Sequence, residues 1–257
     1  MQKYQAPSVK RAFHILKLIS DAERGLTLSE LAKSLGVSKS SVLGITAAME
    51  EIGAIIRNPF DRRYTIGYTL IELGKKGLAR FPLKEISRRH IEGLVEQTGE
   101  TVFLGICKDY QILILDVVES RKELKITSPI GTKIPLTAGA AGKIFLAFMD
   151  EKTALKLITT KALKRFTKNT ITDSEKYLQE IRKVRAKGFA TDHEEYLQGV
   201  NAVAALIKNN SSVLTAIWVV GFSSFLTEVK MHRVIEKTLV AANAISEEMK
   251  RGEKAHE

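Results

Sequence analysis

Residues 27–45 combine polar side chains and apolar ones in a pattern that suits contacts with phosphates and bases. The stretch reads TLSELAKSLGVSKSSVLGI. Its second half carries Ser38, Lys39, Ser40, Ser41 and Leu43. Hydroxyl and ammonium groups hydrogen-bond phosphate oxygens or base edges, and an aliphatic side chain can touch a thymine methyl group. This chemistry is nucleic-acid recognition, and it requires a helix that presents these side chains together.

The apolar residues of the same stretch change phase at Gly36. They are Leu31, Leu35, Val37, Val42 and Ile45. One continuous helix cannot bury all five, but two helices joined by a tight turn can. Ala32 is small enough for a close helix crossing, and Gly36 accepts the positive φ of the corner. We interpret the stretch as a DNA-binding helix-turn-helix, with an ordinary αα-hairpin as the alternative.

Local signals predict the elements around this motif. Thr27 and Glu30 form the pattern of a capping box, and Ser8 can cap an earlier helix that packs through Phe13, Ile15, Leu16 and Ile19. The sequences AIIR (54–57) and YTIG (64–67) predict two strands around a turn. Three helices and a hairpin make a winged helix-turn-helix over residues 1–67. The candidate DNA contacts are Thr27, Ser38, Lys39, Ser40, Ser41, Leu43 and the wing arginines Arg57, Arg62 and Arg63.

Residues 68–81 and 82–257 predict a linker and a second domain. YTLIELGKKGLARF has a helical spacing of leucines and is followed by Pro82, which predicts a linker helix over residues 68–81. Further helices are expected near residues 84–98, where Gly99 would end the helix, and near residues 138–149, 151–158, 174–187 and 227–249. Strands are expected at residues 101–107, 112–118, 124–130, 189–192, 200–207 and 214–221. The fold class is therefore a two-domain α+β protein with a mixed sheet flanked by helices in the second domain.

Composition restricts the class of protein. The chain of 257 residues has 40 basic and 29 acidic side chains and a net charge of +11, which suits a polyanionic partner. The opening MQKYQAPSVKRAF has no apolar leader segment, and no apolar run approaches the roughly 20 residues of a membrane span. We expect a cytoplasmic protein without a membrane partner. The single cysteine, Cys107, lies in the apolar run TVFLGIC and is interpreted as a small buried residue.

Motifs for catalysis are incomplete in this sequence. GAAGK (139–143) lacks both the upstream glycine and the following Ser or Thr of a phosphate-binding loop. His193-Glu194 begins like a zinc protease motif, but Leu197 occupies the position of the second histidine. We therefore expect no enzyme activity, no metal and no cofactor. A purely architectural DNA binder is the other alternative, but it would leave the second domain without a task.

The order of motifs along the chain resembles the IclR family of bacterial and archaeal transcription regulators. The similar segments are SVKRAFHILKLI, the helix-turn-helix, RRYTIGYTLIELG, TGETVFLGI, TAGAAGK, NTITD, GFATDHEEYLQGVNAVAA and SSFLTE. The resemblance implies a GAF-like effector-binding domain over residues 82–257. It also implies homodimers, which can pair as a dimer of dimers, on a palindromic operator in double-stranded DNA. Repression is the expected mode of regulation.

One departure from the family lies in the recognition helix. Family members commonly carry His or Tyr followed by Arg where this chain has Leu43 and Gly44. Base specificity is therefore expected from the serines, Lys39 and Leu43. Gly44 either permits close backbone approach to DNA or has no role.

A second departure lies in the effector pocket that the resemblance implies. Its wall comprises Ile126, Ala140, Ala141, Asp192, Val200, Ala202, Trp218 and Val220. The family usually places Cys at position 202, and members that bind small oxo-acids can have Ser at positions 218 and 220. We expect a small effector with an apolar or aromatic body and a carboxylate that docks at the helix start in TAGAAGK. The alternative is that Trp218 fills the cavity, which leaves a regulator without a small-molecule effector.

Overall fold

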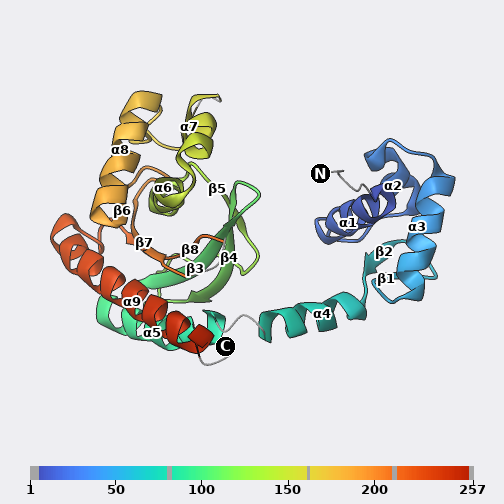
Figure 1. Ribbon diagram of the computed structural model, residues 1–257, viewed down its shortest axis with the longest axis horizontal. Coiled ribbons are helices and arrows are strands. Elements are labelled where there is room, and N and C mark those ends of the chain that lie inside the picture. Colours follow the sequence, from blue (N-terminus) through green and yellow to red (C-terminus); the bar gives the residue numbers. More distant parts are fainter. Residues whose placement is uncertain (1–5, 80–82, 161–162, 210–212, 255–257) are drawn as a thin grey trace. The chain divides into compact units, whose positions relative to one another are not determined.

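The computed structural model of the protein describes residues 6–79, 83–160, 163–209 and 213–254 (Figure 1). The chain divides into two compact units, Met1–Phe81 and Pro82–Glu257. Each unit has its own hydrophobic core, since the buried apolar side chains form one cluster in the first unit and two in the second.

The first unit is a cluster of helices with a short hairpin. Its elements are α1 (Pro7–Ser20), α2 (Leu28–Leu35), α3 (Lys39–Glu51), β1 (Ile55–Arg57), β2 (Tyr64–Ile66) and α4 (Tyr68–Ala79). Strands β1 and β2 pair antiparallel, with Ile55 opposite Ile66. Core side chains that are at most 1% exposed come from all five elements before α4, and they include Ile15, Leu31, Val42, Ile55 and Tyr64. This arrangement confirms the predicted three helices and wing.

Helix α1 differs from its prediction in two ways. It begins at Pro7 without a side-chain cap, so Ser8 lies inside the first turn and the predicted Ser8 cap is wrong. Proline is favoured at this position because its fixed φ suits the helix start. Ile15 and Ile19 are buried as expected, but Phe13 is 63% exposed. At 100° per residue, Phe13 points about 200° away from Ile15 and cannot share its face.

Helix α4 exposes much of its apolar surface. Tyr68 is 73% exposed, Ile71 47% and Leu73 58%. The helix continues to Ala79, and its predicted end at Pro82 falls at residues 80–82, outside the described residues. At 100° per residue, Tyr68 and Ile71 lie on one side of the helix and Leu73 on the other, so apolar surface is exposed on both sides.

A six-stranded antiparallel sheet forms the centre of the second unit. Its strands are β3 (Thr101–Lys108), β4 (Gln111–Val118), β5 (Lys133–Pro135), β6 (Phe189–His193), β7 (Val200–Ile207) and β8 (Thr215–Phe222). They lie in the order β5-β4-β3-β8-β7-β6. Each strand has neighbours that run in the opposite direction.

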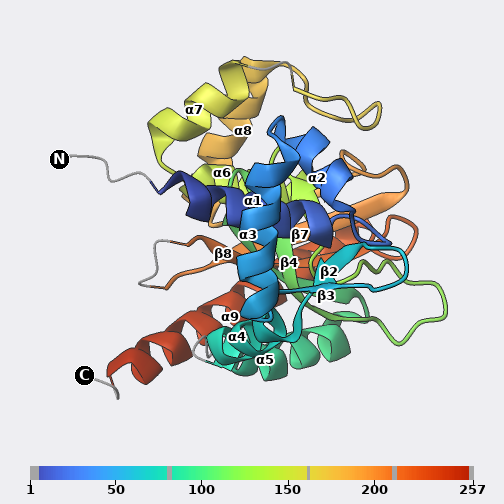
Figure 2. The same ribbon diagram turned by 90° about the vertical axis from the view of Figure 1, so that its right-hand side faces the viewer.

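Helices cover both faces of this sheet (Figures 1 and 2). One layer holds α5 (Leu83–Thr98) and α9 (Glu228–Lys254), and the other holds α6 (Gly139–Phe148), α7 (Glu151–Thr159) and α8 (Ser174–Lys187). Side chains alternate between the two layers, so Leu104 and Val219 pack toward α5 and α9 while Phe103 and Trp218 pack toward α6. The predicted two-domain α+β fold class is confirmed.

The prediction of a strand over residues 124–130 is wrong. The segment has no ladder partner and ends in a turn, in which Thr132 N donates to Pro129 O at 3.2 Å and Gly131 has φ 89°. Pro129 has no N–H for a ladder, and the turn interrupts the extended run. The edge strand is instead the shorter β5, whose Ile134 pairs with Ile112.

Candidate functional site

A tight corner joins α2 to α3. Gly36 ends α2 with φ 65°, and the space around it is open, so backbone conformation rather than crowding requires glycine. In the capping box of α2, Thr27 N donates to Glu30 Oε2 at 2.7 Å and Glu30 N donates to Thr27 Oγ1 at 3.3 Å. Ser38 caps α3, because its Oγ accepts from Ser41 N at 3.3 Å. These local contacts fix the geometry of the helix-turn-helix and confirm the corner and the capping box.

The first turn of α3 presents polar groups on an exposed surface. Ser38 Oγ lies 3.0 Å from Ser40 Oγ and 2.9 Å from Ser41 Oγ, and Lys39 is exposed beside them. Leu43, one turn further, is 48% exposed. The N-terminal end of a helix also offers free N–H groups and a positive dipole. The surface can therefore bind phosphate and place side chains against base edges.

The three wing arginines have different environments. Arg62 is exposed at the turn between β1 and β2 and has φ 59°. Arg63 instead forms a bidentate ion pair with Glu30, at 2.9 and 3.2 Å. The guanidinium of Arg57 lies over the ring of Tyr64, 5.4 Å from its centroid. Only Arg62 therefore has the free side chain at the wing tip that the sequence predicted for all three.

A cavity of about 210 Å³ lies in the second unit between the sheet and α6. Its wall is mainly apolar. The structure brings all eight sequence-predicted pocket residues to this wall, namely Ile126, Ala140, Ala141, Asp192, Val200, Ala202, Trp218 and Val220. Other wall residues that the sequence reasoning missed include Phe103, Ile114, Thr127, Ser128, Thr132 and Tyr196. The alternation of β4 could have indicated Ile114, since Ile112 and Ile114 point to the same face.

The ring of Trp218 lines the cavity without filling it. It stacks on Phe103, with 5.6 Å between ring centroids and 15° between ring planes. Gly105 makes room for this position, because a Cβ there would come within 2.7 Å of the indole. The cavity thus remains open beside a tryptophan that is 4% exposed.

Asp192 closes one end of the cavity at the N-terminus of α6. Its side chain belongs to β6 and the residue is 4% exposed, and Oδ1 accepts from Glu195 N at 2.6 Å. Oδ2 lies against Gly139, where an added Cβ would collide with it. Burial raises the pKa of Asp192 to about 6, because loss of water disfavours the carboxylate, and the charge of Glu195 acts in the same direction.

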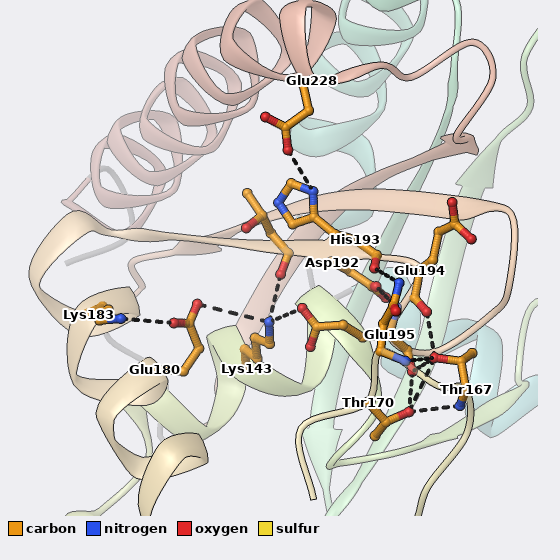
Figure 3. Close-up of polar contacts among 12 residues, drawn as sticks. Lys143, Thr167, Thr170, Glu180, Lys183, Asp192, His193, Glu194, Glu195 and Glu228 are labelled. Carbon is orange, nitrogen blue, oxygen red and sulfur yellow. Dashed lines mark hydrogen bonds and ion pairs between the residues drawn. The ribbon is translucent and has the colours of Figure 1, made fainter.

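Lys143 of α6 fixes the loop that follows β6. Its Nζ is buried, donates to Glu195 Oε1 at 2.6 Å and lies 4.0 Å from Glu180 Oε1 of α8 (Figure 3). The hydroxyls of Thr170 and Thr167 donate to Glu195 O at 2.7 and 3.2 Å. A buried amine and two hydroxyls therefore hold the loop whose Glu195 N–H donates to Asp192, the carboxylate of the cavity.

The described residues contain neither a metal-binding cluster nor a membrane-spanning helix. Within the described residues, no three His, Cys, Asp or Glu side chains are grouped so that they could hold a metal ion. No helix of the described chain is long and apolar enough to cross a membrane.

A winged helix-turn-helix unit followed by a separate sheet domain with an internal cavity is typical of a class of protein, the two-domain DNA-binding regulators. Family comparisons agree. The model of the IclR helix-turn-helix domain matches residues 8–59, and that of the bacterial transcriptional regulator IclR C-terminal domain matches residues 75–247. The chain therefore belongs to the IclR family. It is a DNA-binding transcription regulator and not an enzyme.

Individual relatives cover nearly the whole chain. The transcriptional repressor IclR of Escherichia coli K12 is 26% identical over 94% of this chain and 89% of its own. An IclR regulator from Alicyclobacillus acidocaldarius is 29% identical, with a TM-score of 0.81 over 96% of this chain and all of its own. An IclR homolog from Microbacterium hydrocarbonoxydans, solved with 4-hydroxybenzoate, has a TM-score of 0.78 over 95% and 99% at 18% identity, a likeness in fold.

Proposed function

We propose that this cytoplasmic regulator binds a palindromic operator as a homodimer, or as a dimer of dimers, and represses transcription. The main support for operator binding is the exposed first turn of α3, where three serine hydroxyls surround the helix start beside Lys39. One recognition helix covers one half-site, so two copies are needed for a palindrome. The exposed apolar side chains of α4 supply a surface on which two copies can pair.

The wing supplies a test of the DNA interface. Replacing Arg62 by alanine should weaken operator binding at every sequence and reduce the slope of log K against log salt by about 1, since one phosphate contact is lost. Arg121→Ala is the control, because Arg121 is also exposed but belongs to the second unit. An unchanged salt slope would remove the wing tip from the interface. Light scattering should give at least a dimer, and a monomer bound to operator DNA would contradict the assembly.

We infer that the cavity binds a small effector with an apolar or aromatic body and a carboxylate. The volume of about 210 Å³ exceeds the about 150 Å³ that accommodates benzene in an engineered protein cavity. Its walls would leave extra polar groups of a ligand unpaired, which is costly. A regulator of the same fold has been crystallised with 4-hydroxybenzoate, so this fold accommodates an aromatic acid.

Trp218 provides the readout for this inference, since it is the only tryptophan of the chain. Aromatic carboxylates should change its emission and raise the melting temperature of the protein, and they should alter operator binding. Glyoxylate and pyruvate are the small, polar controls. If only these two acids shift the emission, the apolar effector is wrong. If none of the acids does, the protein regulates without an effector of this class.

A further inference from the structure

The N-terminus of α6, at one end of the cavity, is suited to an anion, and the carboxylate of Asp192 already lies beside it. The N-terminus of α6 directs N–H groups and a positive dipole toward this end of the cavity. Asp192 Oδ2 lies against Gly139, the first residue of that helix. A ligand carboxylate that docks on the same N–H groups would therefore face the carboxylate of Asp192 at close range.

Positive side chains among the described residues offset this second negative charge only in part, because the nearby charge of Lys143 lowers the pKa of Asp192 less than burial raises it. The other charged wall residue is Lys133 of β5, which pairs with Leu113 in the sheet. Leu113 lies between Ile112 and Ile114, which both pack into the core on the cavity side of the sheet, so alternation directs the side chains of Leu113 and Lys133 to the opposite face. Lys133 is exposed there.

The elements packed around Asp192 carry further titratable groups. These are Lys143 on α6, Tyr177 and Glu180 on α8, and Glu195 and Tyr196 in the loop. Lys143 is engaged with Glu195 at 2.6 Å. His193 follows Asp192 in β6 and points to the other face, where its Nδ1 lies 3.4 Å from Glu228 (Figure 3). Lys143 therefore acts on Asp192 only from a distance, and in this part of the described structure two facing carboxylates would have no direct ion pair of their own.

We propose that Asp192 makes effector binding proton-linked, so that a carboxylate effector binds at the N-terminus of α6 together with one proton that it shares with Asp192. This inference rests on the proposed effector class. Two ionised carboxylates in one buried site repel each other, which raises the free energy of the complex. One proton shared between them removes the repulsion and forms a hydrogen bond. Burial already favours the protonated form of Asp192, so the proton is taken up from neutral solution at moderate cost.

Benzoate and its neutral amide, benzamide, are matched probes. Titrations followed by Trp218 emission should show benzoate affinity falling about tenfold per pH unit above pH 6, because one proton enters with the ligand. Benzamide brings its own N–H donor for Asp192, so its binding takes up no proton and falls little between pH 6 and pH 8. Calorimetry at pH 7.5 in two buffers of different ionisation enthalpy should report uptake of about one proton for benzoate and none for benzamide.

Asp192→Asn tests the assignment of the proton. The asparagine amide can donate to a ligand carboxylate without a proton from solvent. Benzoate should therefore bind this variant at least tenfold more tightly than the native protein at pH 8, with affinity independent of pH. His193→Gln is the matched control, and it should keep the native pH dependence.

Three results would overturn the inference in distinguishable ways. Benzoate binding without proton uptake by the native protein would refute the shared proton while leaving the effector class intact. Weaker benzoate binding by folded Asp192→Asn at pH 8 would refute the role of Asp192. The third result is that none of the three acids benzoate, 4-hydroxybenzoate and phenylacetate binds, and none of their amides does. The proposed effector class is then wrong, and this inference fails with it.

Discussion

Replacing Asp192 by asparagine should stabilise the ligand-free protein at neutral and alkaline pH. The pKa of this carboxyl rises from 3.8 to about 6 on folding, and each tenfold change in proton affinity corresponds to about 1.4 kcal/mol. The folded state therefore loses about 3 kcal/mol of stability as pH rises from below 3.8 to above 6. Asparagine has no charge to bury, so it avoids this loss. Its Nδ2 group would face the N–H groups of α6, which reduces the expected gain to about 1–3 kcal/mol.

The sign and the pH window make this prediction testable. Unfolding of the second unit, followed by Trp218 emission, should occur about 2–12 °C higher in Asp192→Asn than in the native protein at pH 8. At pH 4.5 most of the advantage should disappear, because the native carboxyl is then protonated in the folded state. Glu123→Gln, at an exposed position, should show no such dependence. Equal or lower stability of Asp192→Asn at pH 8, or a difference that is constant with pH, would refute the reasoning.

Three other substitutions have defined outcomes. Gly105→Ala should push the indole of Trp218 toward the cavity, which would shift the Trp218 emission and weaken benzoate binding at least tenfold. Gly93→Ala is the control, because a Cβ there has ordinary space, and it should leave the emission and the affinity unchanged. Lys143→Met should lower the free energy of unfolding in urea by about 3–5 kcal/mol, since it leaves the Glu195 carboxylate, whose side chain is only 13% exposed, without its partner. Arg63→Ala should lower the melting temperature of the first unit while changing the salt slope of DNA binding less than Arg62→Ala does, because the Arg63 guanidinium is already paired.

The helix-turn-helix was readable from sequence because its determinants are local. The positive φ of Gly36, the Thr27 capping box and the Ser38 cap depend on residues at most four positions apart. Hydrogen bonds over such short separations depend mainly on residue types that the sequence shows directly. The Ser8 cap failed in the same range, because Pro7 provided a competing helix start.

Ion pairs and strand pairing between residues far apart in the sequence could not be predicted from it. Arg63 bonds Glu30 across 33 positions, so the sequence showed an arginine on a turn but not its engaged guanidinium. The strand expected over residues 124–130 depended on a ladder partner that the sheet does not provide. A strand pattern predicts which residues are extended, but strand pairing also depends on whether a neighbouring strand is available in the folded sheet.

The cavity shows the same division. The sequence, through its resemblance to a family, identified eight wall residues, and their apolar character followed directly from their types. Whether Trp218 fills or lines the space depended on Gly105 and Phe103, which lie on a neighbouring strand. The position of Asp192 against Gly139 likewise arises only when β6 and α6 pack together. Sequence alone determined the residue types, the periodicity and the local caps, whereas tertiary packing decided which charges face each other in a buried space. The reason is that electrostatic interactions there depend on the distance between the charges and on the exclusion of water.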